Sequence, residues 1–226
     1  MVEIFMISGK NRERYFKIIS PVVDFFARAG IHPHVLSFAG FILSILAGVV
    51  YGAGAFFWAG WIVVIAGTCD AMDGLIARQS NKNSVFGAFL DSTLDRYSDM
   101  FLFAGLAYYF AGGHWLSRQL ISEEGGGQAS PWTVFAIIMV IAGSYMVSYA
   151  RARAETLGIA CKVGLMQRPE RMVLLIIGSL LGAIPVFGVI LLQATLVILA
   201  VTSNITALHR IFYVRNQIKK ENLQAQ

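Results

Sequence analysis

The sequence predicts an all-α integral membrane protein, a bundle of six transmembrane helices preceded by an amphipathic helix at the membrane surface. Three observations lead to this fold class. Of the 226 residues, 57% are hydrophobic and only 14% are charged. The mean hydropathy is +0.65. Two long stretches, residues 35–69 and 172–209, carry no charge at all. A soluble domain or a disordered chain would be much richer in charged residues.

Residues 1–33 are expected to form a cytoplasmic amphipathic segment. Between Tyr15 and Ala29 apolar residues recur at helical spacing, with basic residues before and among them. This pattern is typical of a helix that lies in the headgroup layer with its cations among anionic lipids. A solvated leader packed against the bundle is the alternative. A secretory signal is excluded because there is no long apolar core and no small-residue cleavage site. Pro33 is expected to end the segment.

Residues 35–69 are expected to form two spans. One helix of this length would extend roughly 50 Å, whereas the apolar core of a bilayer is about 30 Å thick. The sequence Gly-Ala-Gly at 52–54 is the natural hairpin. The first span is therefore expected at about 35–51, and the second begins near Ala55 and continues into the polar sequence around Asp70.

Four further spans follow. Residues 89–110 are mostly apolar but include four charged residues, so a hydropathy scan undervalues this third span. Residues 132–149 form the fourth. The uncharged stretch 172–209 contains a turn at 182–185, which divides it into a short fifth span and a long sixth that ends at Arg210.

The distribution of basic residues predicts the orientation. Six spans place both termini on one side of the membrane. Of 18 Lys and Arg residues, Arg96 lies within a span and Arg118 alone lies in the loop between the third and fourth spans. The other sixteen fall on the face that holds the termini, so that face is expected to be cytoplasmic. Topology thus accounts for the net charge of +5, and no nucleic-acid partner is expected. The six-span domain should cover 34–216, with a cytoplasmic tail at 217–226.

Four aspartates are the candidate metal ligands. Asp70 and Asp73 are three residues apart and Asp91 and Asp95 four apart, so each pair projects from one face of its helix. A short polar turn at 79–83 can bring the two faces together near the cytoplasmic side. At an effective dielectric of about 20 and separations of about 5 Å, each pair of carboxylates repels by about 3 kcal/mol. Such a cluster requires cations.

Hard divalent cations are the expected cofactors, because Mg²⁺ and Mn²⁺ prefer oxygen ligands. Two such ions could hold a diphosphate and polarise its phosphorus, and a carboxylate that is not fully used by metal could accept a proton from an attacking alcohol. Gly74, Ala77 and Gly87 keep the adjoining helix faces small, either for a ligand or for ordinary helix packing. Acidic residues near a membrane core are functional more often than they are simply solvated.

At these residues the chain resembles the CDP-alcohol phosphatidyltransferases. The signature of that family consists of two motifs, each containing two aspartates and at least one glycine. A spacer of about eight residues, here 79–86, separates them. The matching positions are Asp70, Asp73, Gly74, Ala77, Arg78, Gly87, Asp91 and Asp95. With the six expected spans, the resemblance extends over nearly the whole chain.

The resemblance implies a reaction and a set of roles. The family transfers a phosphatidyl group from CDP-diacylglycerol, or its archaeal ether counterpart CDP-archaeol, to an alcohol and releases CMP. The four aspartates would hold two ions, Mg²⁺ or Mn²⁺, and Asp95 would be the general base. The residues that would contact the CDP-lipid are Gly74, Ala77, Arg78, Ser84 and Gly87. A homodimer is also implied. Asp99 lies outside the signature and is expected to support Arg96 or Arg78.

The acceptor alcohol must be inferred from a second polar region, 148–171. Clustered arginines suit an acceptor that carries a phosphate, because a guanidinium presents forked donors to phosphate oxygens. The region resembles the branch of the family that uses inositol 1-phosphate, which implies that its phosphate is bound by Ser148, Arg151, Arg168, Arg171 and Arg210. Glycerol 3-phosphate is the alternative acceptor. These arginines could also serve only membrane topology and the surface pairs Arg151–Glu155 and Arg168–Glu170.

Two other functional classes share some of these features. An intramembrane prenyltransferase also holds a diphosphate on aspartate-rich helices, but six spans are few for it and its motifs lack the Gly and Ala-Arg positions found here. An ion transporter needs polar residues along a path through the membrane. Residues 101–110 and the first span are apolar, so the polar groups stop near one face. The sequence therefore favours a cell-membrane transferase whose active site faces the cytoplasm.

Overall fold

The computed structural model describes residues 21–23, 26, 33–79, 84–113, 129–161 and 163–224. These residues form helices and no strands, which confirms the all-α prediction for the part of the chain described. The principal helices are α2 (Pro33–Gly52), α3 (Phe56–Gln79), α4 (Val85–Phe110), α6 (Pro131–Thr156), α7 (Arg168–Gly182) and α8 (Gly188–Gln224). Of the predicted N-terminal segment, most lies outside the described residues. Val23 is buried in a small cluster with Leu36 of α2 and Met72 and Ile76 of α3.

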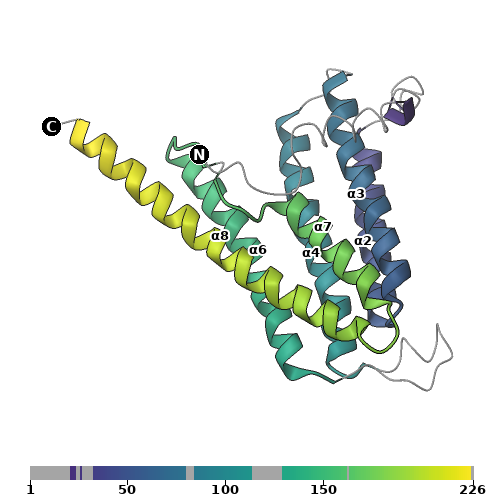
Figure 1. Ribbon diagram of the computed structural model, residues 1–226. Coiled ribbons are helices and arrows are strands. Elements are labelled where there is room, and N and C mark those ends of the chain that lie inside the picture. The colour runs from purple at the N-terminus through teal and green to yellow at the C-terminus, as the bar shows by residue number, and fades with distance from the viewer. Residues whose placement is uncertain are drawn as a thin grey trace.

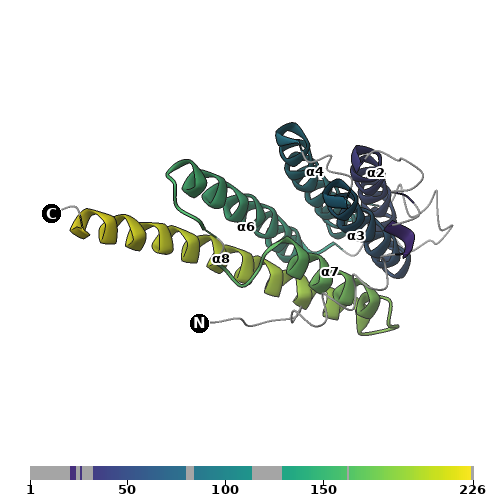
Figure 2. The ribbon, with the colours of Figure 1, turned by 90° about the horizontal axis from the view of Figure 1, so that it is seen from above.

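The six helices are arranged in a ring. Helix α2 packs on α3 and α4, α7 packs on α3 and α8, and α6 packs on α4 and α8. Figures 1 and 2 show α2, α3 and α4 as one group, α6 and α8 side by side as another, and α7 between the two groups. Each helix therefore has two principal neighbours, and α7 closes the ring between segments that are far apart in the sequence.

The predicted turns are observed. Helix α2 ends at Gly52, and Gly54 has a φ of +86°, a left-handed conformation that glycine adopts at no steric cost. Helix α7 ends at Gly182, and the chain turns through residues 183–187 before α8 begins.

One boundary was predicted wrongly. The sixth helix does not end at Arg210, because α8 continues to Gln224. Residues 211–224 contain neither Gly nor Pro, and their side chains are compatible with an α-helix. The helix therefore continues past the point where the charged sequence begins. The predicted tail at 217–226 therefore starts inside α8.

Among the described residues, four helices are long and apolar enough to cross a membrane: α2, the 56–76 part of α3, α6, and the 188–220 part of α8. This agrees with a membrane protein. The charged residues of α4 keep it outside this group, and the 15 residues of α7 extend only about 22 Å. The count of six spans therefore remains a prediction. Apolar side chains along α8, such as Val197, Val201 and Ile205, are about half exposed, as lipid-facing residues would be.

Close packing of α2 against α4 holds one side of the ring. Tyr51 of α2 and Phe103, Leu106 and Phe110 of α4 belong to the buried core between these helices and their neighbours. The two backbones meet at Gly48 and Gly105, where a methyl group on Gly105 would overlap the Gly48 carbonyl. Small residues that permit such approach are typical of helix contacts in membranes.

We expect Gly105→Ala to lower the free energy of unfolding by about 1–3 kcal/mol, because the added methyl group must push α2 and α4 apart. The measurement is thermal unfolding of the purified protein in detergent. Gly67→Ala is the matched control, since a Cβ there meets no atom within 4 Å. Equal unfolding temperatures for the two variants would contradict the close approach.

Candidate active site

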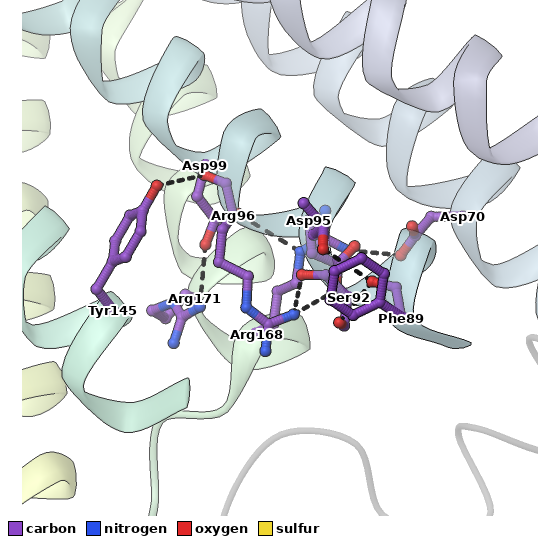
Figure 3. A network of polar contacts seen from close by, with 10 residues as sticks. Asp70, Phe89, Ser92, Asp95, Arg96, Asp99, Tyr145, Arg168 and Arg171 are labelled. Carbon is purple, nitrogen blue, oxygen red and sulfur yellow. Dashed lines mark hydrogen bonds and ion pairs between the residues drawn. The ribbon is translucent and has the colours of Figure 1, made fainter. Parts of the chain in front are cut away.

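Three of the predicted metal ligands lie together. Asp70 comes from α3, and Asp91 and Asp95 come from adjacent turns near the start of α4 (Figure 3 shows Asp70 and Asp95). Each offers a carboxylate oxygen, and these oxygens all lie within 4.8 Å of one another. Carboxylate oxygens from two helices are a donor set that fits a hard divalent cation such as Mg²⁺ or Mn²⁺.

Asp73 faces a different neighbour. It is 6% exposed, and its Oδ2 accepts a hydrogen bond from Ser37 Oγ of α2 at 2.5 Å. A residue three positions after Asp70 is rotated by roughly 300° around the helix axis, so the two side chains diverge by about 60°. The structure thus gathers three of the four predicted ligands, and the role of Asp73 as a ligand stays a prediction. The contact with Ser37 was missed because it joins residues 36 positions apart on separate helices.

Arg168 lies among the carboxylates. One of its terminal nitrogens is 2.5 Å from Asp70 Oδ2 and 2.8 Å from Asp95 Oδ1. Its Nε is 3.4 Å from Asp99 Oδ1. Burial disfavours the charged guanidinium, but Asp70, Asp99 and Asp95 outweigh this effect and raise the pKa of Arg168. The structure shows that Arg168 supplies positive charge to the aspartates, and its role in binding the acceptor phosphate stays a prediction.

Asp99 connects Arg168 to Arg171. Asp99 Oδ2 lies 3.0 Å from a terminal nitrogen of Arg171, and both side chains are buried. Arg168 and Arg171 lie in the first turn of α7, three residues apart, so one carboxylate of α4 contacts both (Figure 3).

Of the two predicted partners of Asp99, Arg96 is not the one that the structure shows, and Arg78 stays a prediction. Arg96 donates to the Ser92 carbonyl within its own helix and lies 4.0 Å from Asp95, whereas the ion pairs of Asp99 among the described residues are with Arg168 and Arg171. The side chain of Arg78 lies outside the described residues. The partners that the sequence did not reveal lie on α7, about 70 residues further along the chain.

A cavity of about 580 Å³ lies between α4, α6, α7 and α8. This volume is within the usual range for ligand pockets. Its wall contains all five predicted acceptor residues: Ser148 and Arg151 of α6, Arg168 and Arg171 of α7, and Arg210 of α8. The α4 side of the wall contains Asp91, Asp95 and Asp99. A smaller cavity of about 30 Å³ lies between α2, α3 and α4, and Asp91, Asp95 and Arg168 border both cavities.

The arginines of the larger cavity differ in how they are held. Arg210 is buried, and its Nε and one terminal nitrogen donate to the backbone carbonyls of Val163 and Val147 at 2.8 and 2.6 Å. It therefore ties α8 to α6. Arg151 forms an exposed pair with Glu155 at 2.9 Å, as the surface-pair alternative predicted. Arg168 forms ion pairs with Asp70 and Asp95 instead of the surface pair with Glu170 that the same alternative predicted.

Two residues on the wall of the larger cavity have buried polar atoms that lack a hydrogen-bond partner among the described residues. They are Nε and NH1 of Arg171 and the hydroxyl of Ser144. Buried donors of this kind are rare unless a ligand or water satisfies them. Ser144 lies one turn before Ser148 on α6 and was missed by the sequence analysis, because a serine in an apolar helix carries no distinctive pattern.

The residues predicted to contact the CDP-lipid lie where α3 ends and α4 begins. Ser84 caps α4 by accepting a hydrogen bond from the Gly87 amide at 2.9 Å. A methyl group on Gly87 would lie 3.0 Å from His34 Cε1, so glycine lets the first turn of α2 approach that of α4. Gly74 is half-buried in α3. The side chains of Ala77 and Arg78 lie outside the described residues, and the CDP-binding roles of all five stay predictions.

Comparison with known proteins places the chain among enzymes of lipid synthesis. A family profile described as CDP-alcohol phosphatidyltransferase matches residues 30–206. The chain is 32% identical to the phosphatidylinositol phosphate synthase of Cutibacterium acnes, over 90% of this chain and 95% of that protein. It is 31% identical to the archaetidylinositol phosphate synthase of Methanothermobacter thermautotrophicus, over 90% and 91%.

The fold is also similar to solved structures of a phosphatidylinositol phosphate synthase. The phosphatidylinositol phosphate synthase of Mycobacterium tuberculosis with CDP-DAG bound superposes with a TM-score of 0.73 at 28% identity, covering 88% of this chain and 94% of that one. The same enzyme in complex with manganese and citrate gives a TM-score of 0.72, covering 86% and 87%.

We expect Asp99→Asn to lower the free energy of unfolding by about 3–5 kcal/mol, because it leaves the buried guanidinium of Arg171 without its counter-charge. Chemical unfolding in detergent measures this. Arg151→Gln is the control, since it breaks an exposed pair and should cost at most about 1 kcal/mol. Similar losses in both variants would argue against a structural role of the buried pair.

Proposed function

The chain belongs to the CDP-alcohol phosphatidyltransferase family, and we propose that it transfers a phosphatidyl-type group from a CDP-linked lipid to inositol 1-phosphate, releasing CMP and forming phosphatidylinositol phosphate. The observation that carries this proposal is the larger cavity, where carboxylates suited to a divalent ion and arginines suited to a phosphate line one space. Relatives named for the phosphatidyl and archaetidyl products support the acceptor and leave both CDP-diacylglycerol and CDP-archaeol as donors.

The proposed metal ligands are Asp70, Asp73, Asp91 and Asp95. The complex of a relative with manganese supports a divalent ion, and we propose two ions, Mg²⁺ or Mn²⁺. When bound, such ions would neutralise the diphosphate of the donor and make its phosphorus more electrophilic. Three of these carboxylates already lie within reach of one another, which supports their shared role.

Asp95 is the proposed general base. It belongs to the carboxylate group and also borders the larger cavity that faces the arginines. An acceptor whose phosphate is held on the α6 and α7 side can therefore direct a hydroxyl toward the α4 side. Asp95 would accept the proton of that hydroxyl as its oxygen attacks the donor phosphorus.

The proposed phosphate-binding residues are Ser148, Arg151, Arg168, Arg171 and Arg210. Arg171 makes the clearest case, because its Nε and NH1 are buried donors with no partner among the described residues. Phosphate oxygens are acceptors suited to charged donors of this kind. Glycerol 3-phosphate would satisfy the same arginines but is less favoured, because the relatives compared act as inositol phosphate lipid synthases.

The CDP-lipid is proposed to bind where α3 ends and α4 begins, with Gly74, Ala77, Arg78, Ser84 and Gly87 contacting its polar part. A relative with CDP-DAG bound supports a CDP-lipid as the donor. We propose that the six helices all span the cell membrane, that the site faces the cytoplasm and opens sideways to lipid, and that the protein is a homodimer, as the family resemblance implies.

We expect Asp95→Asn to reduce kcat about 10²–10⁴-fold, because the amide cannot accept the proton from the acceptor hydroxyl. CMP release from CDP-diacylglycerol in the presence of Mg²⁺ or Mn²⁺ is the assay, and excess EDTA should abolish it for the wild-type protein. The thermal unfolding temperature of the variant serves as the control for folding. Full turnover by the variant would rule Asp95 out as the base, and metal-independent release of CMP would exclude the metal role.

The acceptor is tested by offering inositol 1-phosphate, glycerol 3-phosphate, inositol and serine separately, each with CDP-diacylglycerol or CDP-archaeol. We expect a lipid product, identified by mass spectrometry, only with inositol 1-phosphate. The free alcohols leave the arginines of the cavity without an anion, and the relatives compared are named as inositol phosphate lipid synthases, which disfavours glycerol 3-phosphate. A product formed only from glycerol 3-phosphate would overturn the assignment of inositol. Absence of CMP release with any acceptor would favour a prenyltransferase or a transporter.

A further inference from the structure

Arg168 has a position that the proposed function does not explain. It borders both cavities, it contacts carboxylates proposed to bind metal, and it belongs to the residues proposed to bind the acceptor phosphate. These roles compete for one guanidinium. We propose that Arg168 exchanges between the aspartates and the acceptor phosphate, so that binding of a divalent ion and binding of the acceptor promote each other. This inference rests on the proposed function.

The first step is that Arg168 and a divalent ion exclude each other. The Arg168 nitrogen lies 2.5 Å from an oxygen of Asp70 and 2.8 Å from an oxygen of Asp95. Oxygens in an Mg²⁺ site lie about 2.0–2.1 Å from the ion. An ion that uses these two oxygens needs the space that the guanidinium fills, and the two positive charges also repel. Ion binding therefore requires the Arg168 side chain to withdraw.

The second step concerns where the side chain goes. Arg168 already borders the larger cavity, and its Nε contact with Asp99 is on the wall of that cavity. Asp99 can retain the side chain while its terminal nitrogens leave Asp70 and Asp95. In the larger cavity these nitrogens would approach Arg171, whose Nε and NH1 are unpartnered among the described residues. Two adjacent guanidiniums repel unless an anion lies between them, so a phosphate stabilises the withdrawn position.

The third step is that the other described arginines of this cavity are less suited to this exchange. Arg210 is fixed by two backbone carbonyls, and Arg151 is paired with Glu155 at the surface. Arg96 lies 4.0 Å from Asp95 and donates to the Ser92 carbonyl. Among the described residues, Arg168 alone forms ion pairs shorter than 3 Å with the carboxylates proposed to hold metal.

Thermodynamic linkage gives the consequence. If an ion stabilises the withdrawn position of Arg168 and a phosphate stabilises the same position, each ligand increases the affinity for the other by the same factor. The coupling disappears when position 168 carries no cation, because no side chain then has to be moved. Affinity for the ion alone should then increase, because the competing charge is gone.

The experiment measures Mn²⁺ binding to the purified protein at equilibrium, without CDP-lipid so that no turnover occurs. Binding is measured by electron paramagnetic resonance of free Mn²⁺, with and without saturating inositol 1-phosphate. For the wild-type protein we expect inositol 1-phosphate to lower the Mn²⁺ Kd by about tenfold. For Arg168→Gln we expect a lower Mn²⁺ Kd than for the wild type and a change of less than about twofold on adding inositol 1-phosphate.

Arg96→Gln is the matched control, since it removes the same charge near Asp95 without emptying the space between the carboxylates. Arg96→Gln should keep the full effect of inositol 1-phosphate on the Mn²⁺ Kd. Arg168→Lys keeps a cation at position 168 and should keep part of that effect. Thermal unfolding confirms that each variant is folded.

Several results would overturn the inference. If Arg168→Gln keeps the full coupling, the phosphate contacts the ion directly and Arg168 does not mediate it. Independent binding of Mn²⁺ and inositol 1-phosphate to the wild-type protein would exclude the exchange and leave the proposed function intact. Two further results would show that the charge of Arg168 does not compete with the ion. One is weaker Mn²⁺ binding by Arg168→Gln than by the wild type, and the other is the same Mn²⁺ Kd and the same coupling in the Gln and Lys variants. If the wild-type protein binds no Mn²⁺, the proposed metal site fails as well.

Discussion

The structure depends on neutralising carboxylates that lie on helices bordering a membrane. Asp70, Asp91 and Asp95 bring oxygens within 4.8 Å of one another, and Asp99 is buried one turn further along α4. Like charges at such distances are strongly unfavourable unless cations join them, and ionised groups near an apolar phase cost still more. In this fold the first turn of α7 supplies that charge. The electrostatic requirement of α3 and α4 thereby fixes where a helix from the second half of the chain must begin.

Helix α7 can meet this requirement because small residues let it pack closely. Gly60 of α3 faces Ser179, and Gly178 leaves room for Thr195 of α8. Tyr51 of α2 shares a hydrogen bond with Ser179 at 2.5 Å. Once α7 is held between α3 and α8, its first turn forms a wall between two cavities. Arg168 in that turn borders both cavities, as do Asp91 and Asp95, so the two halves of the proposed reaction share residues.

Local sequence was sufficient for the features that depend on spacing. The uncharged stretches and the Gly-rich turns predicted the helices and their order, because helix length and turn chemistry are set by neighbouring residues. The aspartate spacing on α3 and α4 predicted that their carboxylates would meet, and three of the four do. The charged sequence at Arg210 does not mark the end of α8, because no helix-breaking residue follows it.

The sequence by itself determined the fold class, the family and the identity of the charged residues, because a motif of fixed spacing on two successive helices needs no knowledge of distant contacts. Only the tertiary structure decided how those charges are paired. Asp73 turns to Ser37, Asp99 joins Arg168 to Arg171, and Arg168 enters the aspartate cluster. These partners come from helices that are distant in the chain. Their pairing follows from the closed ring, in which the long-range packing of α7 selects one set of neighbours from many that the sequence allows.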